Sequence, residues 1–305
     1  MSSEIISYSA AHRAAVTALA EQTLDLPEDA GEAASVIDRL LDPPAGRHTV
    51  RLVALDPAGA LTGVLFASVR EGDPSVGHLD LVAVAAPVRR RGIARALITT
   101  AEETLHGYGV SRLRIAGNDP CYGWPGIDVR YTPAVCTALA LGFEQTRTAW
   151  NMTVDLAGAV APADAEAGLA AAGVTVRGAE PSDVPALEAF AASHFGGGWG
   201  WEAGQAIARH AAGAVAGCHL ALRGAELLGF AAFGALRPSL FGPMATAPDA
   251  QGLGIGGVLL RRCLYDMRAA GLATAQIGWA GPVAFYAGAV AARIERVFVL
   301  YAKPL

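Results

Sequence analysis

Two six-residue segments, Arg89–Ala94 and Gln251–Gly256, have the residue types of an anion-binding turn. Each opens an apolar-periodic stretch, and each has glycine or alanine at its fourth and sixth positions. The first amides of a helix have no partners within the helix, and the helix dipole adds partial positive charge there. Small residues let a ligand approach such amides closely. Both segments therefore predict a binding site for a phosphate or pyrophosphate group.

Other nucleotide-binding motifs do not fit these segments. Neither turn ends in the Gly-Lys-Ser/Thr of a Walker A motif. Each follows several antiparallel-looking strands, whereas a Rossmann turn follows the first strand of a βαβ unit. The cations Arg89, Arg90 and Arg91 stand at a predicted helix start, where the dipole disfavours positive charge unless an anion is bound. Their position therefore favours an anion site over a solvated basic patch.

The pattern Arg/Gln-x-x-Gly-x-Gly/Ala, between a strand that ends near a proline and an amphipathic helix, resembles motif A of the GNAT acyltransferases. It occurs twice, so the chain resembles a tandem GNAT N-acetyltransferase-like protein, with a layout similar to that of mycothiol synthase. The resemblance implies that acetyl-coenzyme A (acetyl-CoA) binds as the acyl donor, its pyrophosphate on the turn amides and its pantetheine arm along the preceding strand. The implied binding residues are Val82, Ala83, Val84, Arg89, Arg90, Arg91, Gly92, Ile93 and Ala94 in the first copy, and Met244, Ala245, Thr246, Gln251, Gly252, Leu253, Gly254, Ile255 and Gly256 in the second.

The resemblance also implies a catalytic acid. The family often places a tyrosine opposite the leaving thiolate, on a helix before the final strands, and Tyr286 is the candidate here. A tyrosine with a pKa of ~10 stays protonated at neutral pH beside a thiol of pKa ~8.5. The alternative is a packed aromatic ring with a hydrogen-bonded hydroxyl. The first copy has Ala138 four residues before Gly142, where the tyrosine is expected, so the chemistry is expected in the C-terminal copy.

The general base has several candidates. Glu202 is the catalytic candidate, because the segment Ser193–Glu202 falls where the family's acceptor loop lies. The alternative for this segment is a glycine-rich turn with packed tryptophans, and His194 within it is also readily explained as an ordinary polar residue. His78 and Asp80 alternate to one face of a predicted strand in the first copy and are weaker base candidates. Many members of the family use only ordered water, so activity does not require a side-chain base.

A second unusual segment, Asn118–Asp128, is stiffened by prolines and glycines. It carries four polar or aromatic side chains: Asp119, Tyr122, Trp124 and Asp128. Segments of this length in a compact domain are often functional. Asp128 and Tyr122 are suited to a cationic acceptor. A structural role, sealing the junction between the two halves, is an equal alternative.

The elements around the two turns repeat as well. Gly92 and Gly254 are 162 residues apart, and each turn is preceded by a strand pair and followed by a helix and another strand. We predict an α/β (α+β) fold of two tandem GNAT-like domains, each a mixed, mostly antiparallel sheet flanked by helices. The predicted boundaries are 1–157 for the N-terminal domain, 158–173 for a linker or short exposed helix, and 174–305 for the C-terminal domain.

Composition limits the classes of function. The 23 Lys and Arg and 28 Asp and Glu give a net charge of −5, which argues against a broad nucleic-acid surface. The mean hydropathy of +0.36 comes from alanine and glycine, and we find no uninterrupted apolar run of the ~20 residues that a membrane span needs. The four cysteines show no CxxC pair and no metal-ligand spacing. We expect a cytoplasmic protein that binds no metal.

The sequence therefore predicts an acyl-CoA-dependent N-acetyltransferase that moves an acetyl group directly to the amine of a small molecule. The alternatives are a non-catalytic acyl-CoA-binding or sensing protein and an acetyltransferase of protein amines. The pI of ≈ 5.8 gives a mild preference for basic acceptors. The sequence leaves open the acceptor, the acyl chain, the number of coenzyme molecules bound and the oligomeric state.

Overall fold

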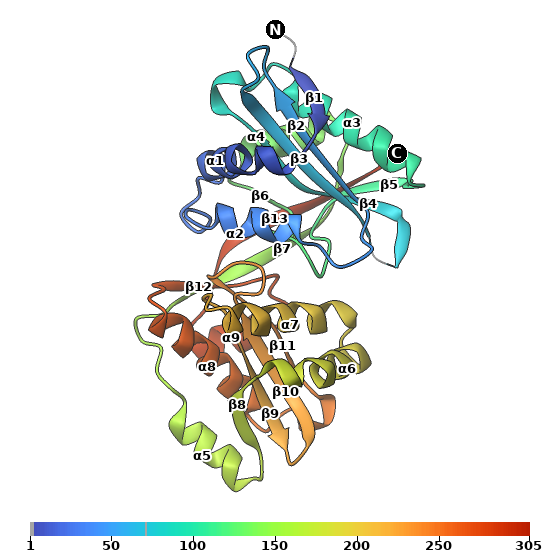
Figure 1. Ribbon diagram of the computed structural model, residues 1–305. Helices are drawn as coiled ribbons and strands as arrows, with labels where there is room; N and C mark the ends of the chain where they lie inside the picture. Colours follow the sequence, from blue (N-terminus) through green and yellow to red (C-terminus); the bar gives the residue numbers. More distant parts are fainter. Residues whose placement is uncertain (1–2, 71) are drawn as a thin grey trace. The chain divides into compact units, whose positions relative to one another are not determined.

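The computed structural model describes residues 3–70 and 72–305, which form two compact units (Figure 1). Unit 1 comprises Met1–Ala149 and Arg296–Leu305, and unit 2 comprises Trp150–Glu295. Unit 1 holds β1 (Glu4–Ser7), η1 (Ala10–His12), α1 (Arg13–Thr23), α2 (Ala33–Leu41), β2 (Thr49–Leu55), β3 (Leu61–Arg70), β4 (Asp73–Val84), η2 (Ala86–Val88), α3 (Ile93–Gly107), β5 (Arg112–Ile115), β6 (Ile127–Asp128), α4 (Thr132–Ala140), the first half of β7 (Glu144–Asp155) and most of β13 (Arg293–Pro304). Unit 2 holds the rest of β7, α5 (Ala163–Ala171), β8 (Thr175–Gly178), η3 (Pro181–Asp183), α6 (Val184–His194), α7 (Gly197–Ala211), β9 (Gly217–Arg223), β10 (Glu226–Phe233), β11 (Leu240–Thr246), η4 (Pro248–Ala250), α8 (Ile255–Ala269), β12 (Thr274–Ile277) and α9 (Val283–Val290).

The sheet of unit 1 is mostly antiparallel, with strand order β1-β2-β3-β4-β5-β13 and one parallel pair, β4 with β5. Helix α3 packs on β2, β3 and β4, while α1 packs on β3, β4 and α2. Residues at helical spacing on α3, among them Leu97, Ala101 and Leu105, are fully buried in the core of this unit. This periodic apolar stripe is what fixes the helix on the sheet.

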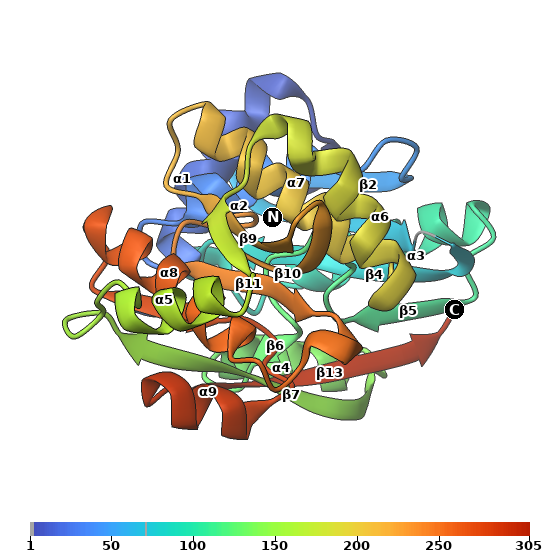
Figure 2. The ribbon, with the colours of Figure 1, turned by 90° about the horizontal axis from the view of Figure 1, so that it is seen from below.

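Unit 2 repeats the arrangement. Its strand order is β12-β11-β10-β9-β8, and β11 with β12 is again a parallel pair. Figure 2 shows β8–β11 between the α6 and α7 helices and the α5 and α8 helices. Val258, Leu259, Cys263 and Met267 of α8 are buried in one core with residues of β9–β12. The predicted mixed, mostly antiparallel sheet flanked by helices is confirmed in both units.

The two copies have exchanged their last strands. In unit 1, β13 pairs antiparallel with β5, with Ala302 opposite Arg114. In unit 2, the second half of β7 pairs antiparallel with β12, with Thr153 opposite Gln276. Each sheet is therefore completed by the final strand of the other sequence copy. The predicted boundaries at 157 and 174 follow the sequence copies, whereas the division of the chain into compact units falls within β7 and within β13.

Two segments differ from the sequence-based expectation or refine it. The predicted linker contains α5, which is anchored by a two-pronged ion pair between Glu166 and Arg262 of α8. The supposed loop Ser193–Glu202 is helical from Gly197 onward, because α7 begins there and packs closely on α6. No helix in the described ranges is long and apolar enough to span a membrane.

Candidate functional site

The parallel pair in each unit separates partway along, which exposes one edge of the longer strand. In unit 1 the β4–β5 register runs from Val76–Arg112 to His78–Arg114. Beyond His78, β4 continues to Val84 paired with β3 alone. In unit 2 the register ends at Phe241–Ile277, and β11 continues to Thr246 paired with β10. Peptide groups that face the opening can therefore hydrogen-bond to an extended ligand. The predicted pantetheine-binding segments, Val82–Val84 and Met244–Thr246, lie at these freed edges.

The turns that follow have the same backbone conformation in both copies. Arg89 (φ −58°, ψ 159°) corresponds to Gln251 (φ −66°, ψ 153°). The glycines that begin the two helices, Gly92 and Gly254, are both left-handed, with φ 85° and 84°. Between them, Arg90 has φ 65° where the second copy has Gly252 at φ 83°. The internal repeat is thus also a repeat of backbone geometry.

The first residue of each turn ties the turn to its strand. Arg89 Nε donates to the carbonyl oxygen of Val84 at 3.0 Å, and Gln251 Nε2 lies 3.5 Å from the carbonyl oxygen of Thr246. Both carbonyls belong to the last residue of the freed strand. This contact was not predicted from the sequence, although both copies have a residue with a long hydrogen-bond donor at this place.

The turns leave open space where a phosphate group would lie. A Cβ built on Gly92, Gly252 or Gly254 would meet no other heavy atom within 4 Å. Within residues 3–70 and 72–305, no side chain caps either helix start, so the first amides of these helices have no capping partner of that kind. At Gly256 a Cβ would have ordinary contacts of 3.4 Å or more, which explains how Ala94 takes this place in the first copy. Both turns therefore fit a pyrophosphate held by helix N-terminal amides.

The backbone of Arg90 is strained, because a left-handed φ costs a residue other than glycine about 1–2 kcal/mol. The other left-handed residues of the two turns are glycines. We expect Arg90→Gly to raise the free energy of unfolding by about 0.5–1 kcal/mol, since relief of strain exceeds the entropy that glycine adds to the unfolded chain. Urea unfolding would measure the change. Arg91→Gly removes the same charge at a residue without positive φ and should lower stability by a similar amount; equal effects of the two variants would contradict the assignment.

Tyr286 of α9 lies against the point where β11 leaves β12. Its ring packs edge-on against Phe241, with centroids 6.3 Å apart, and the tyrosine is 6% exposed. The preceding residue, Phe285, would be 3.5 Å from a Cβ at Gly256 in the turn, and Met244 Cε would be 3.4 Å from it. Phe285 and Met244 therefore lie beside the start of α8, and Tyr286 packs against Phe241 at the end of the β11–β12 pairing. Burial raises the pKa of Tyr286 to about 12.

In unit 1 the sequence predicted the corresponding place at Ala138, which lies on α4. The amide of Phe143, which follows left-handed Gly142, donates to the carbonyl of Ala138 at 3.1 Å. In unit 2 the amide of Ala292, which follows left-handed Ala291, donates to the carbonyl of Tyr286 at 3.4 Å. Both residues are buried, but Ala138 lies two residues before the end of α4 and Tyr286 lies four residues before the end of α9, so the two positions are not equivalent.

The base candidates of unit 2 lie on α6 and α7. Glu202 is 5% exposed and lies on the buried face of α7 together with Ala203 and Ala206. His194 ends α6 with Nδ1 3.0 Å from the carbonyl oxygen of Phe190, an ordinary helix-end contact. The contacts of His194 are local, which favours the interpretation that it is an ordinary polar residue.

The segment Asn118–Asp128 makes several structural contacts. Trp124 Nε1 donates to Asp29 at 3.0 Å, and Asp128 accepts hydrogen bonds from Arg130 and Arg296. Burial opposes the charge of Asp128, yet these hydrogen bonds hold its pKa below the ordinary value. The contacts of Trp124 and Asp128 therefore anchor this segment within unit 1.

Comparison with known proteins agrees with this geometry. Residues 14–123 match the model of the acetyltransferase (GNAT) family, whose members use acetyl-CoA. Several solved structures are similar over 99% of this chain, and three of them follow. A fungal multi-domain β-N-acetylglucosaminidase with a glucosamine N-acetyltransferase region has 16% identity and a TM-score of 0.74, and this chain spans 38% of its length. A tandem GNAT protein from the clavulanic acid biosynthesis pathway has 19% identity and a TM-score of 0.69, and this chain spans 98% of its length. A GCN5-related N-acetyltransferase from Sphaerobacter thermophilus has 16% identity and a TM-score of 0.63, and this chain spans 95% of its length.

None of the curated proteins matches the chain. The solved structures share the fold at low identity, and the family match lies within unit 1. Unit 2 repeats the separated strands, the turn and the flanking helices of unit 1. Residues 14–123 therefore match the GNAT acetyltransferase family, and the chain as a whole has the fold of tandem GNAT proteins.

Proposed function

We propose that the protein transfers the acetyl group of acetyl-CoA directly to the amine of a small molecule, with the chemistry in unit 2. The observation that carries this proposal is the placement of α9, whose Phe285 lies beside the start of α8 and whose Tyr286 packs against Phe241 of β11. Two structural neighbours are associated with small molecules: one has a glucosamine N-acetyltransferase region, and the other comes from the clavulanic acid biosynthesis pathway. Both are compatible with a small acceptor here.

Each element has a distinct task in this proposal. The amides that begin α8 bind the pyrophosphate, because the helix dipole and the absence of a side-chain cap leave them available to an anion. The freed edge of β11 around Met244–Thr246 binds the pantetheine arm, and one of its amides polarises the thioester carbonyl. Acetyl-CoA supplies the activated acetyl group. The shape of the site aligns the amine with that carbonyl.

The high pKa of Tyr286 defines how it assists. A hydroxyl of pKa about 12 stays protonated at neutral pH. Full transfer of its proton to a thiolate of thiol pKa ~8.5 would be uphill by roughly 5 kcal/mol. Tyr286 therefore donates a hydrogen bond to the departing sulfur, and the proton that ends on the sulfur comes from the amine. Glu202 stays our candidate for the group that accepts a proton in this unit.

Tyr286→Phe removes this donor and keeps the packed ring. We expect kcat to fall about 10²-fold, the loss typical of removing one hydrogen bond to developing negative charge. The KM for acetyl-CoA should change little, because the turn and strand remain. Release of coenzyme thiol in a screen of small amines is the measurement. Tyr265→Phe, on an exposed part of α8, is the matched control; a kcat that is unchanged in Tyr286→Phe would remove Tyr286 from the mechanism.

Two other functions use the same binding site. A sensing protein would bind acetyl-CoA and release no thiol with any amine. An acetyltransferase of protein amines would release thiol with peptides and not with small amines. The same screen, extended to lysine peptides and peptide N-termini, separates these functions from the one proposed.

A further inference from the structure

Unit 2 has a cavity of about 440 Å³ at the end of α8 that lies away from the turn at Gly254. Its walls come from the ends of β8, α7, β10 and α8 and from the start of β9. Asp266, which lines it, is twelve residues after Gly254, about 18 Å along a helix that rises 1.5 Å per residue. In the strand order, β10 stands between β9 and the freed strand β11. The cavity is therefore separate from the turn that we propose for the pyrophosphate.

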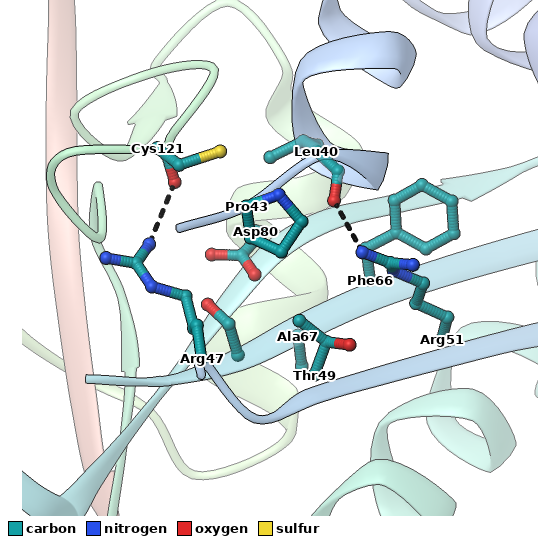
Figure 3. A pocket seen from close by; sticks show the side chains of 10 residues that line it. Leu40, Pro43, Arg47, Thr49, Arg51, Phe66, Ala67, Asp80 and Cys121 are labelled. Carbon is teal, nitrogen blue, oxygen red and sulfur yellow. Dashed lines mark hydrogen bonds between the residues drawn. The ribbon is translucent and has the colours of Figure 1, made fainter. Parts of the chain in front are cut away.

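The volume of this cavity suits an organic molecule, since small-molecule sites measure roughly 300–1,000 Å³. The cavity beside Asp80 in unit 1 (Figure 3) is far smaller, at about 10 Å³, roughly the room of one water molecule. Asp80 stands there at a bulge of β4, where the register passes from Phe66–Leu81 to Ala67–Leu79. Arg47 and Arg51 line the same cavity. It has room for a water molecule between charges of both signs, and not for an organic ligand.

Asp266 supplies a negative charge to the wall of the cavity in unit 2. Its Oδ2 accepts a hydrogen bond from His219 Nε2 at 2.6 Å, and its side chain is still 42% exposed. Among the described residues, no arginine or lysine forms an ion pair with it. Two arginines of α8 are engaged elsewhere: Arg262 pairs with Glu166, and Arg268 donates to a backbone carbonyl. The Asp266 carboxylate therefore has an exposed side that is available to a cation.

Two histidines add hydrogen-bond acceptors to the same wall. His210 Nδ1 lies 2.9 Å from the carbonyl oxygen of Ala216, and His219 Nε2 contacts Asp266. Carbonyl and carboxylate oxygens only accept, so these two nitrogens donate, and in the neutral rings His210 Nε2 and His219 Nδ1 are acceptors. His219 Nδ1 is buried without a hydrogen-bond partner in the part of the chain that the structure describes. The wall therefore favours a ligand that carries N–H donors.

The helix ends and the remaining wall agree with a positively charged, partly apolar ligand. Both α7 and α8 end at the cavity, where their dipoles add partial negative charge. Val215 and Phe233 give the largest apolar surfaces, and most of the other lining residues are alanine or glycine. Arg177 donates to the carbonyl of Gly178 on the rim, but its guanidinium is already paired with both carboxylate oxygens of Asp183. An anionic end and an apolar side thus face one another across the cavity wall.

We propose that this cavity is a binding site for a small organic cation. The ammonium group of the ligand pairs with Asp266 and donates to His210 Nε2, and its apolar body lies against Val215 and Phe233. A carboxylate or phosphate group would meet the charge of Asp266 and the negative ends of two helices, so anions are disfavoured. The site goes beyond the proposed function, whose amine acceptor lies beside the freed strand β11, and it does not require acetyl-CoA.

The probe is 2-phenylethylammonium, titrated into the full-length protein without coenzyme. Imidazole nitrogen NMR should show a saturable shift of the His210 signal, which is identified as the signal that His210→Gln lacks. Two compounds with a similar phenyl body separate charge from apolar contact: 2-phenylethanol has a neutral head, and 3-phenylpropionate has an anionic one. Both should bind at least about 10-fold more weakly, because the hydrogen bond between two charged groups is lost. Equal affinity for all three compounds would overturn the proposal.

Two variants test the site itself. Asp266→Asn removes the charge at nearly constant volume and should weaken binding of the cation at least about 10-fold. Asp164→Asn is the matched control, because Asp164 is an exposed residue of α5 that does not line the cavity. Ala270→Phe should also weaken binding, because Ala270 is exposed at the end of α8 and a phenyl ring there fills the cavity while the fold persists. Unchanged binding of the cation in both Asp266→Asn and Ala270→Phe would show that the cavity is not its site.

The outcomes also distinguish this proposal from the proposed function. A protein that shows the His210 shift but releases no thiol with any amine overturns the proposed function and leaves the cation site standing. A protein that releases thiol with small amines, and whose His210 signal does not move with 2-phenylethylammonium, overturns the cation site alone.

Discussion

Replacing Arg296 by methionine is expected to lower the free energy of unfolding of unit 1 by about 3–5 kcal/mol, the range for breaking a buried ion pair from one side. The Arg296 side chain is fully buried. Its Nη1 and Nη2 donate to the two carboxylate oxygens of Asp29 at 2.7 and 2.8 Å, and its Nε donates to Asp128 at 2.8 Å. Methionine keeps most of the volume and removes the charge, so that two buried carboxylates lose their main counterion.

Urea unfolding measures this loss, and hydrogen exchange of β5 locates it in unit 1, because β13 pairs with that strand. Arg13→Met is the control: it removes an exposed pair with Asp38, for which about 0–1 kcal/mol is expected. Neutralising Asp29 and Asp128 together with Arg296 should recover part of the loss, since it removes the unpaired charges. A loss below 1 kcal/mol for Arg296→Met would show that the network does not anchor β13.

Arg296 illustrates what the sequence could not predict. The repeat, the strands around it and both turns follow from local patterns: apolar periodicity, proline at strand ends and glycine at helix starts. The exchange of β7 and β13 depends on which of two similar sheets each final strand joins. That choice is made by long-range contacts such as Arg296 with Asp29, 267 residues away in sequence. No local pattern encodes such a distance.

The candidate site, like the fold, could be predicted from the sequence only in part. The turns at Gly92 and Gly254 were predictable because φ near +85° requires glycine at a place that the sequence marks twice. Asp80 was recognisable as a polar residue on a strand, but its exposure to a cavity depends on a bulge that only the pairing register reveals. Glu202 was expected beside an open loop, and its burial on α7 follows from the close packing of α7 on α6.

Gly254→Asp is expected to weaken acetyl-CoA binding in unit 2 at least 10²-fold. Aspartate tolerates the left-handed conformation of Gly254 better than most residues, so the fold should persist. Its carboxylate would cap the helix amides and place a negative charge where the pyrophosphate binds. Loss of two charge-assisted hydrogen bonds, at about 1.5–3 kcal/mol each, already accounts for a 10²-fold effect.

Calorimetric titration of acetyl-CoA measures both affinity and stoichiometry. If both turns bind, the wild-type protein takes up two molecules, and Gly92→Asp and Gly254→Asp each remove a different one. Gly271→Asp is the matched control, because Gly271 is also left-handed, at φ 90°, but lies at the far end of α8 from the turn. Its binding should equal that of the wild type. Unchanged binding in both turn variants would mean that the helix starts do not hold the pyrophosphate, whereas loss with only one would assign coenzyme binding to that unit alone.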